Sequence, residues 1–208
     1  MHHSLRALAF AAMTSMAANA GVVFSLPNSA FIQIPAVNYF GAGPQAFPGG
    51  TWTSTNYSAV FGYVFGYGFG GNGFWDGSLG PMAGINSSED FSGVNDSMTF
   101  AFDSPVSIIG GFVNYVPGSS VPTTMAVYDS DWNLLSSYNL TFVTGPGVNL
   151  GNVIGFDMGA PVISYLVLTG NYIGIVGKAG TRVIPEPGTL ALMALGLVAA
   201  AAAKRIPR

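Results

Sequence analysis

The sequence predicts an all-β domain, an antiparallel β-sandwich or jelly-roll-like fold, flanked by one helix at each end of the chain. Short runs rich in Val, Ile, Phe, Tyr and Thr are separated by clusters of Gly, Pro, Asn and Asp. Residues 98–102 alternate with period two, and no span between residues 21 and 177 has helical periodicity. Charged residues make up 7% of the chain, against roughly 25% in an average soluble domain, so a helical bundle or coiled coil is excluded.

The expected strands follow one another at short intervals along residues 22–176. Two of them flank the segment Asp129–Asn133, which predicts a hairpin with a five-residue turn. The expected strands are Val22–Ser25, Phe31–Ile34, Ser58–Gly66, Ser97–Asp103, Val106–Val116, Thr123–Tyr128, Leu134–Phe142, Val153–Asp157, Val162–Thr169 and Tyr172–Val176.

Residues 1–20 are typical of a secretory signal peptide that forms a helix. Arg6 is the only charge before an apolar stretch, and Ala18 and Ala20 supply the small side chains that a signal peptidase requires. The alternative is a buried N-terminal helix, which the abrupt change to strand-like residues at Gly21 disfavours. Cleavage after Ala20 would also remove both histidines, at positions 2 and 3.

The C-terminal end predicts a membrane helix rather than a buried core helix. After a linker at 178–184 comes Pro185-Glu186-Pro187, and then an apolar run from Leu190 to Ala203. As a helix this run is about 21 Å long, short of a bilayer core of about 30 Å, and basic side chains reaching to the interface can cover the deficit. The positive-inside rule places the stop of transfer in the cytoplasm, at Lys204, Arg205 and Arg208.

Pro185-Glu186-Pro187, the apolar run and the basic end together resemble the PEP-CTERM sorting signal of Gram-negative bacteria, also catalogued as the ice-binding protein C-terminal domain. The resemblance covers residues 185–208. It implies export through the inner membrane, a membrane-anchored precursor, and processing by an exosortase that leaves the protein at the cell surface or outside the cell. It also implies a link to exopolysaccharide and biofilm. The strand series is similar to the sandwich domains that often precede this tail.

Charge and composition exclude several classes of function. The absence of cysteine excludes disulfide scaffolds and zinc–thiolate sites. Residues 21–184 carry eight acidic and two basic side chains, a net charge of −6, which excludes a nucleic-acid-binding surface. The same acidic excess is compatible with calcium, although no cofactor is required by the sequence.

An aromatic run from Phe61 to Phe69 alternates with glycine and valine. In a continuous strand its rings would share one face, where they could stack on sugar rings. The candidate glycan-contact residues are then Tyr63, Tyr67 and Trp75. The favoured alternative is a core strand, or a Gly-aromatic loop that covers the sandwich.

Two other patterns suggest binding sites but are incomplete. Asp129 and Asp131 match the first half of a calcium loop, but Leu134 and Leu140 occupy the positions of its glycine and glutamate, so a plain turn is favoured. The threonines in 51–55 alternate as on ice-binding surfaces, but one short copy is not an array.

The sequence predicts no enzyme. Without Cys or His in the mature domain, Ser-His-Asp and Cys-His catalysis are absent. A glycosidase with a carboxylate pair is the remaining route, with Glu89 as one partner and Asp76, Asp90, Asp96 or Asp157 as the other. We therefore expect a non-catalytic surface or extracellular-matrix protein. The first alternative is a carbohydrate-binding module that uses an aromatic face, and the further alternative is the glycosidase with a carboxylate pair.

Overall fold

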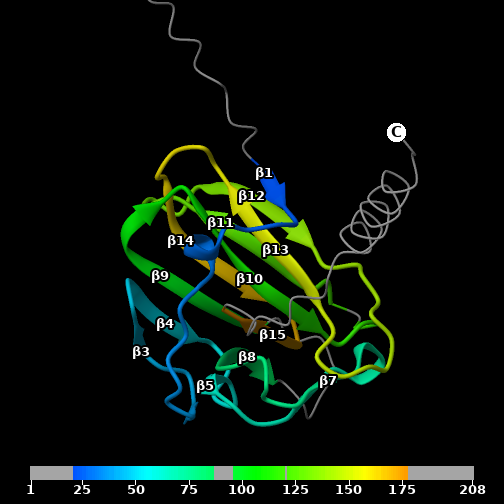
Figure 1. Ribbon diagram of the computed structural model, residues 1–208. Coiled ribbons are helices and arrows are strands. Elements are labelled where there is room, and N and C mark those ends of the chain that lie inside the picture. Colours follow the sequence, from blue (N-terminus) through cyan, green and yellow to red (C-terminus); the bar gives the residue numbers. More distant parts are fainter. Residues whose placement is uncertain (1–20, 87–95, 120, 178–208) are drawn as a thin grey trace, which may run out of the picture. The chain divides into compact units, whose positions relative to one another are not determined.

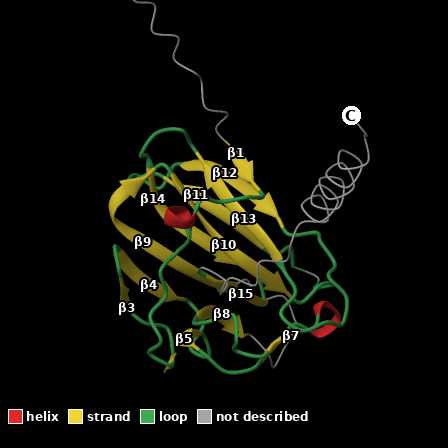
Figure 2. Cartoon of the chain, in the orientation of Figure 1, coloured by secondary structure: helices red, strands yellow, loops and turns green. Residues whose placement is uncertain are grey.

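The computed structural model of the chain describes residues 21–86, 96–119 and 121–177 (Figure 1). Almost all regular structure in them is antiparallel strand, so the predicted all-β class is confirmed (Figure 2). The described helical elements are two 3₁₀ turns, η1 (Asn28–Ala30) and η2 (Gly70–Asn72). The signal helix expected in 1–20 and the membrane helix expected at 190–203 lie outside the described residues.

Sheet A has seven strands in the order β1–β13–β10–β15–β8–β5–β2. Every pairing between neighbouring strands is antiparallel. The strands are β1 (Gly21–Val23), β2 (Tyr39–Phe40), β5 (Val60–Tyr63), β8 (Met82–Asn86), β10 (Ile108–Tyr115), β13 (Asn152–Asp157) and β15 (Tyr172–Val176).

Sheet B has six strands in the order β12–β11–β14–β9–β4–β3, also antiparallel throughout. The predicted hairpin is confirmed, because β11 and β12 pair across the turn 129–133. The strands are β3 (Gln45–Phe47), β4 (Gly50–Ser54), β9 (Ser97–Val106), β11 (Thr124–Tyr128), β12 (Leu134–Asn139) and β14 (Ile163–Thr169).

The two sheets share one hydrophobic core, which makes them the layers of a sandwich. Sheet A contributes buried residues such as Ile154 and Ile175, and sheet B contributes Phe100 and Leu166. Trp52, on β4, is fully buried and stacks on Phe61 of β5, with ring centroids 5.0 Å apart. Because side chains of a strand alternate between faces, each sheet also has an outer face directed away from this core.

A segment between β5 and β8 covers the outer face of sheet A over β5, β8, β15 and part of β10. It contains the two-stranded pair β6 (Tyr67–Gly68) and β7 (Phe74–Trp75). Its rings form a second apolar cluster with outward-facing residues of sheet A. The strand β15 shows the alternation clearly, since Ile173 and Ile175 belong to the shared core while Val176 belongs to the second cluster.

Most predicted strands are confirmed with small shifts of their ends, and the exceptions have physical reasons. Phe31–Ile34 is not a strand; only Phe31 bridges to Gly110. The strand expected over 58–66 ends at Tyr63, because Gly62 has a φ of 67° and a bulge follows Phe61. The sequence missed β8 because its side chains are buried on both faces, which removes the alternation of a half-exposed strand. The other strands it missed are β2, β3, β4, β6 and β7.

Candidate functional site

The aromatic run does not form the exposed face that would contact a glycan. Tyr67 is 6% exposed and Trp75 is 1% exposed, so both belong to the cluster beneath the covering segment. Tyr63 is partly buried against that cluster, and Phe65 projects outward with 58% of its surface exposed. The glycan-contact prediction is therefore wrong for Tyr67 and Trp75, and the alternative of a Gly-aromatic loop covering the sandwich is confirmed.

The polar atoms of these buried rings are used inside the protein. The Tyr67 hydroxyl donates to the carbonyl of Ile85 at 2.8 Å, and the Trp75 indole donates to the carbonyl of Leu150 at 2.8 Å. Burial raises the pKa of Tyr67 well above its usual value, so this hydroxyl stays a neutral donor. Both bonds hold the covering segment in place.

The Asp129 carboxylate closes the turn of the β11–β12 hairpin. Its Oδ1 accepts the backbone N–H of Asp131 and of Asn133, each at 2.9 Å, and its Oδ2 accepts the Asn133 amide at 2.9 Å. These bonds to Asn133, chiefly the one from its side chain, lower the pKa of Asp129. Within the described residues, Asp129 and Asp131 belong to no group of three or more candidate metal ligands. The contacts are those of the turn that the sequence favoured over a calcium loop.

The other acidic side chains are distributed over separate loops. Asp76 accepts the Asn149 amide at 2.8 Å and the Ser78 backbone N–H at 2.8 Å. Asp96 accepts the Asn56 amide at 2.6 Å. Asp157 accepts the backbone N–H of Gly159 at 2.9 Å. Glu89 and Asp90, the remaining candidates for a carboxylate pair, lie outside the described residues.

A buried asparagine network holds the loop 140–151, and sequence reasoning missed it. Asn114 donates to the carbonyls of Asn72 and Leu150, each at 3.0 Å. Asn72 in turn accepts the Thr144 backbone N–H at 3.0 Å and donates to the carbonyl of Tyr115 at 3.1 Å. Both asparagines are fully buried. The only sequence signal is Asn114 inside an otherwise apolar strand, and the two carbonyls to which its side chain donates are 36 and 42 residues away.

The structure places a different set of aromatic rings at the surface, on sheet B. Trp132, in the hairpin turn, lies flat on Tyr165 of β14, with ring centroids 3.9 Å apart and planes 14° from parallel. Tyr128 of β11 lies beside it at 5.6 Å. Trp132 is 52% exposed. We call Trp132, Tyr165 and Tyr128 the aromatic platform. A tryptophan in a polar hairpin turn was the sequence signal that could have revealed it.

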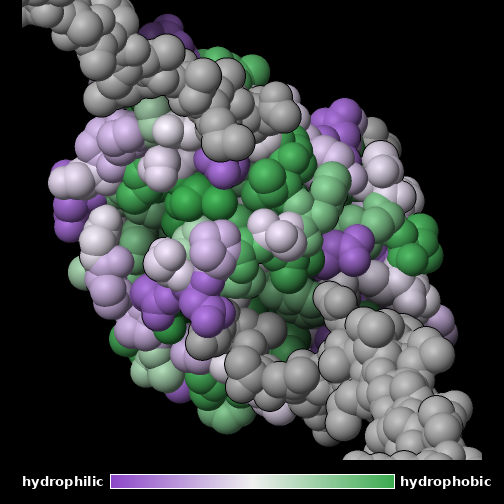
Figure 3. Space-filling view, turned by 45° about the horizontal axis from the view of Figure 1, so that its top comes forward, coloured by the Kyte–Doolittle hydropathy of each residue, from purple (hydrophilic) through white to green (hydrophobic). Residues whose placement is uncertain are grey.

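Exposed apolar side chains are not confined to the platform, and Figure 3 shows hydrophobic residues gathered at the centre of one face with hydrophilic ones around them.

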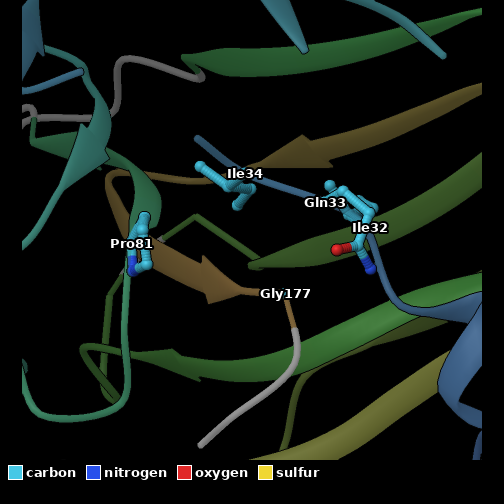
Figure 4. Close-up of a pocket in the computed structure, with 5 residues that line it drawn as sticks. All are labelled: Ile32, Gln33, Ile34, Pro81 and Gly177. Carbon is cyan, nitrogen blue, oxygen red and sulfur yellow. The ribbon is translucent and has the colours of Figure 1, made fainter. Parts of the chain in front are cut away.

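A small pocket lies between Ile32–Ile34, Pro81 and Gly177 at the end of β15 (Figure 4). Its volume is about 160 Å³. Ligand pockets usually measure about 300–1,000 Å³, so this pocket is too small to enclose a sugar unit with its contacts.

The residues predicted to direct processing lie outside the described residues. They are Ala18 and Ala20 at the signal cleavage site, Pro185, Glu186 and Pro187 in the sorting motif, and Lys204, Arg205 and Arg208 at the stop of transfer. No helix among the described residues is long and apolar enough to span a membrane.

Comparison with known families tests this end of the chain. Residues 183–205 match the model of the PEP-CTERM protein-sorting motif. The chain carries a PEP-CTERM sorting signal. The matched residues contain the Pro-Glu-Pro triplet, the apolar run and the first two basic residues on which the resemblance rested. The PEP-CTERM signal marks an exported protein that an exosortase sorts to the surface or membrane of a Gram-negative bacterium. No curated protein and no solved structure matches the chain.

Proposed function

We propose that the sandwich domain is a non-catalytic component of the cell surface or extracellular matrix, associated with exopolysaccharide or biofilm. The observation that carries the proposal is the PEP-CTERM motif directly after the domain, at residues 183–205. A domain with its own export and sorting signals acts where the sorting machinery leaves it. A signal peptidase acting after Ala20 and an exosortase acting near Pro185-Glu186-Pro187 are the two partners required.

Two of the described carboxylates are unsuited to be the general acid of a glycosidase. A glycosidase needs one carboxylic acid whose pKa is raised, so that it is protonated at neutral pH. Hydrogen bonds from Ser78 and then Asn149 lower the pKa of Asp76 to about 2, and those from Asn133 lower the pKa of Asp129. The pKa values of these two carboxylates are therefore lowered, whereas the pKa of a general acid must be raised.

The negative charge of the domain favours association with a neutral matrix polymer, or with an anionic one through bridging cations, over direct binding to an anionic polymer. The described residues contain six aspartates and neither lysine nor arginine. An anionic polysaccharide would be repelled by this surface at low ionic strength.

The test is to express the full chain in a host with its exosortase and in the same host lacking it, then to fractionate the cells and measure the mass of the domain. We expect a product without residues 190–208 in the matrix fraction of the first host, and a longer precursor in the inner membrane of the second. Replacing Pro185, Glu186 and Pro187 with alanine should reproduce the second result. Thr189→Ala, just beyond the triplet, is the matched control.

Two results would overturn the proposal. Retention of residues 190–208 in the inner membrane of both hosts would replace sorting by a permanent anchor. Free release of the processed domain into the medium, without any association with the polysaccharide fraction, would remove the matrix role.

A further inference from the structure

The two outer faces of the sandwich differ, and the difference leaves one face open to a ligand. The outer face of sheet A is covered over β5, β8, β15 and part of β10 by the rings of the segment between β5 and β8. The outward-facing residues at the centre of sheet B remain partly exposed, including Thr99, Tyr165 and Val167. In the same strands Phe100 and Leu166 face the core and are fully buried.

The outer face of sheet B is rich in hydroxyl groups and carries no charge in its central rows. The register aligns these residues across the strands, because Thr53 pairs with Thr99 and Thr124 pairs with Thr169. Neighbouring strands lie about 4.8 Å apart, so the hydroxyls form short ladders. The outward-facing positions of β4, β9, β14 and β11 are Thr51, Thr53, Ser97, Thr99, Ala101, Asp103, Tyr165, Val167, Thr169, Thr124, Ala126 and Tyr128, of which only Asp103, near the end of β9, is charged.

The aromatic platform stands at one end of these rows. Tyr165 pairs with Tyr128 on one side and with Ala101 on the other, so the platform continues directly into the small residues of the face. Trp132 covers Tyr165, and more than half of the surface of Trp132 remains accessible to solvent. On the other side of Tyr128, Leu134 of β12 adds an exposed apolar side chain.

The backbone conformation of Trp132 indicates a functional role for its side chain. Its φ is 62°, in the left-handed region where glycine and asparagine are the favoured residues. A bulky residue there costs of order 1–3 kcal/mol, and such strain concentrates at functional sites. Stacking on Tyr165 offsets part of that cost, but it does not require the indole to be exposed.

We propose that the outer face of sheet B binds a neutral polysaccharide, with one sugar ring stacked on the exposed face of Trp132. The apolar C–H face of a pyranose matches the indole, and the threonine hydroxyls can donate to and accept from the hydroxyls of the following sugar units. The central rows of the face are uncharged, and its charged neighbours, Asp103 on β9 and Asp131 beside Trp132, are exposed and acidic, so the face favours a neutral chain and repels an anionic one. This inference rests on the proposed function and names the ligand class and the residues that bind it.

The test measures binding of the processed, exported protein to a panel of neutral polysaccharides: cellulose, curdlan, dextran and the neutral fraction of the host exopolysaccharide. Alginate serves as the anionic probe. We expect at least one neutral polysaccharide to bind with an affinity that changes little between low and high salt, since no ion pair is involved. Trp132→Gly should lower that affinity at least about thirtyfold, the size of a binding hot spot. Tyr165→Ala should also weaken it.

The controls separate the platform from other aromatic residues and from unfolding. Phe65 is 58% exposed on the opposite layer, so Phe65→Ala should bind like the wild type. Trp132→Gly relieves the positive φ and should keep the thermal midpoint of the wild type or raise it. Trp132→Phe keeps a ring at the site and should retain part of the binding.

Tryptophan fluorescence supplies a direct readout. The chain has three tryptophans, and Trp52 and Trp75 are 0% and 1% exposed, so a quencher in solution reaches Trp132. A bound neutral polysaccharide should protect the fluorescence of Trp132 from quenching by acrylamide. Trp132→Phe lacks this exposed tryptophan, so the protection should be absent in it.

Three outcomes would overturn the inference: no neutral polysaccharide binds, Trp132→Gly binds as tightly as the wild type, or Phe65→Ala loses binding. A concentration-dependent dimer that Trp132→Gly abolishes would assign the face to a second copy of the chain instead. Because sorting and matrix association are measured by fractionation, each of these results leaves the test of the proposed function unaffected.

Discussion

Trp75 packs against Gly174, and a β-carbon built on that glycine would lie 2.9 Å from the indole ring. The same β-carbon would lie 2.9 Å from Phe69 and from the Met82 methyl group. Gly174 occupies an outward-facing position of β15, between Ile173 and Ile175, which face the core. A glycine in the sheet therefore provides the space in which the covering segment places its rings.

We predict that Gly174→Ala destabilises the domain by about 1–3 kcal/mol, because the added methyl group forces the buried rings apart. Gly68→Ala is the matched control, since a β-carbon at Gly68 meets nothing within 4 Å. Chemical denaturation of the two variants measures the difference. Equal stability of Gly174→Ala and the wild type would show that the covering segment is not packed on sheet A.

We predict that the asparagine network stabilises the loop 140–151. Asn72→Ala leaves the Thr144 N–H and the Tyr115 carbonyl without their side-chain partner, which should cost about 1–3 kcal/mol. Asn139→Ala, at an exposed position of β12, should stay within about 0.5 kcal/mol of the wild type. Hydrogen exchange should show the loss of protection concentrated in residues 140–151. Loss spread evenly over both sheets would contradict a local role.

The lowered pKa of Asp76 predicts that the stability of the domain depends on pH. Its pKa is lowered from 3.8 to about 2 in the folded protein, first by the hydrogen bonds from Ser78 and then by the one from Asn149. The folded pKa is below the unfolded one, so its contribution is present above about pH 4 and is lost as the pH falls towards 2. Thermal midpoints from pH 6 to pH 2 should therefore decline less steeply in Asp76→Asn than in the wild type. An identical slope in both proteins would refute this contribution.

The N-terminus predicts where the mature protein begins. The small residues Ala18 and Ala20 predict signal cleavage before Gly21, and Gly21 is the first residue of β1, where it pairs with Asp157. We expect N-terminal sequencing of exported protein to begin at Gly21. Ala20→Arg should block cleavage and leave Met1 in place, because the peptidase accepts only small side chains there. An unprocessed wild-type protein outside the cell would contradict the prediction.

Local features that follow from chain order were readable from the sequence. The alternation in Met98–Phe102 identified β9, and the polar segment Asp129–Asn133 between apolar runs identified the β11–β12 turn. The PEP-CTERM motif was also readable, because a sorting enzyme recognises a short contiguous segment rather than a folded surface.

The tertiary structure alone decided which aromatic residues are exposed. The run from Phe61 to Phe69 and the isolated Trp132 both consist of large rings beside turn residues; the polar turn around Trp132 was a signal of exposure, but no local feature showed that the run is buried. The run is buried because Gly174 and Gly84, more than ten residues away in the chain, leave space for its rings on sheet A. Trp132 is exposed because Tyr165, 33 positions later, lies beneath it in the neighbouring strand. Burial depends on which strands become neighbours, and that pairing is a property of the whole fold.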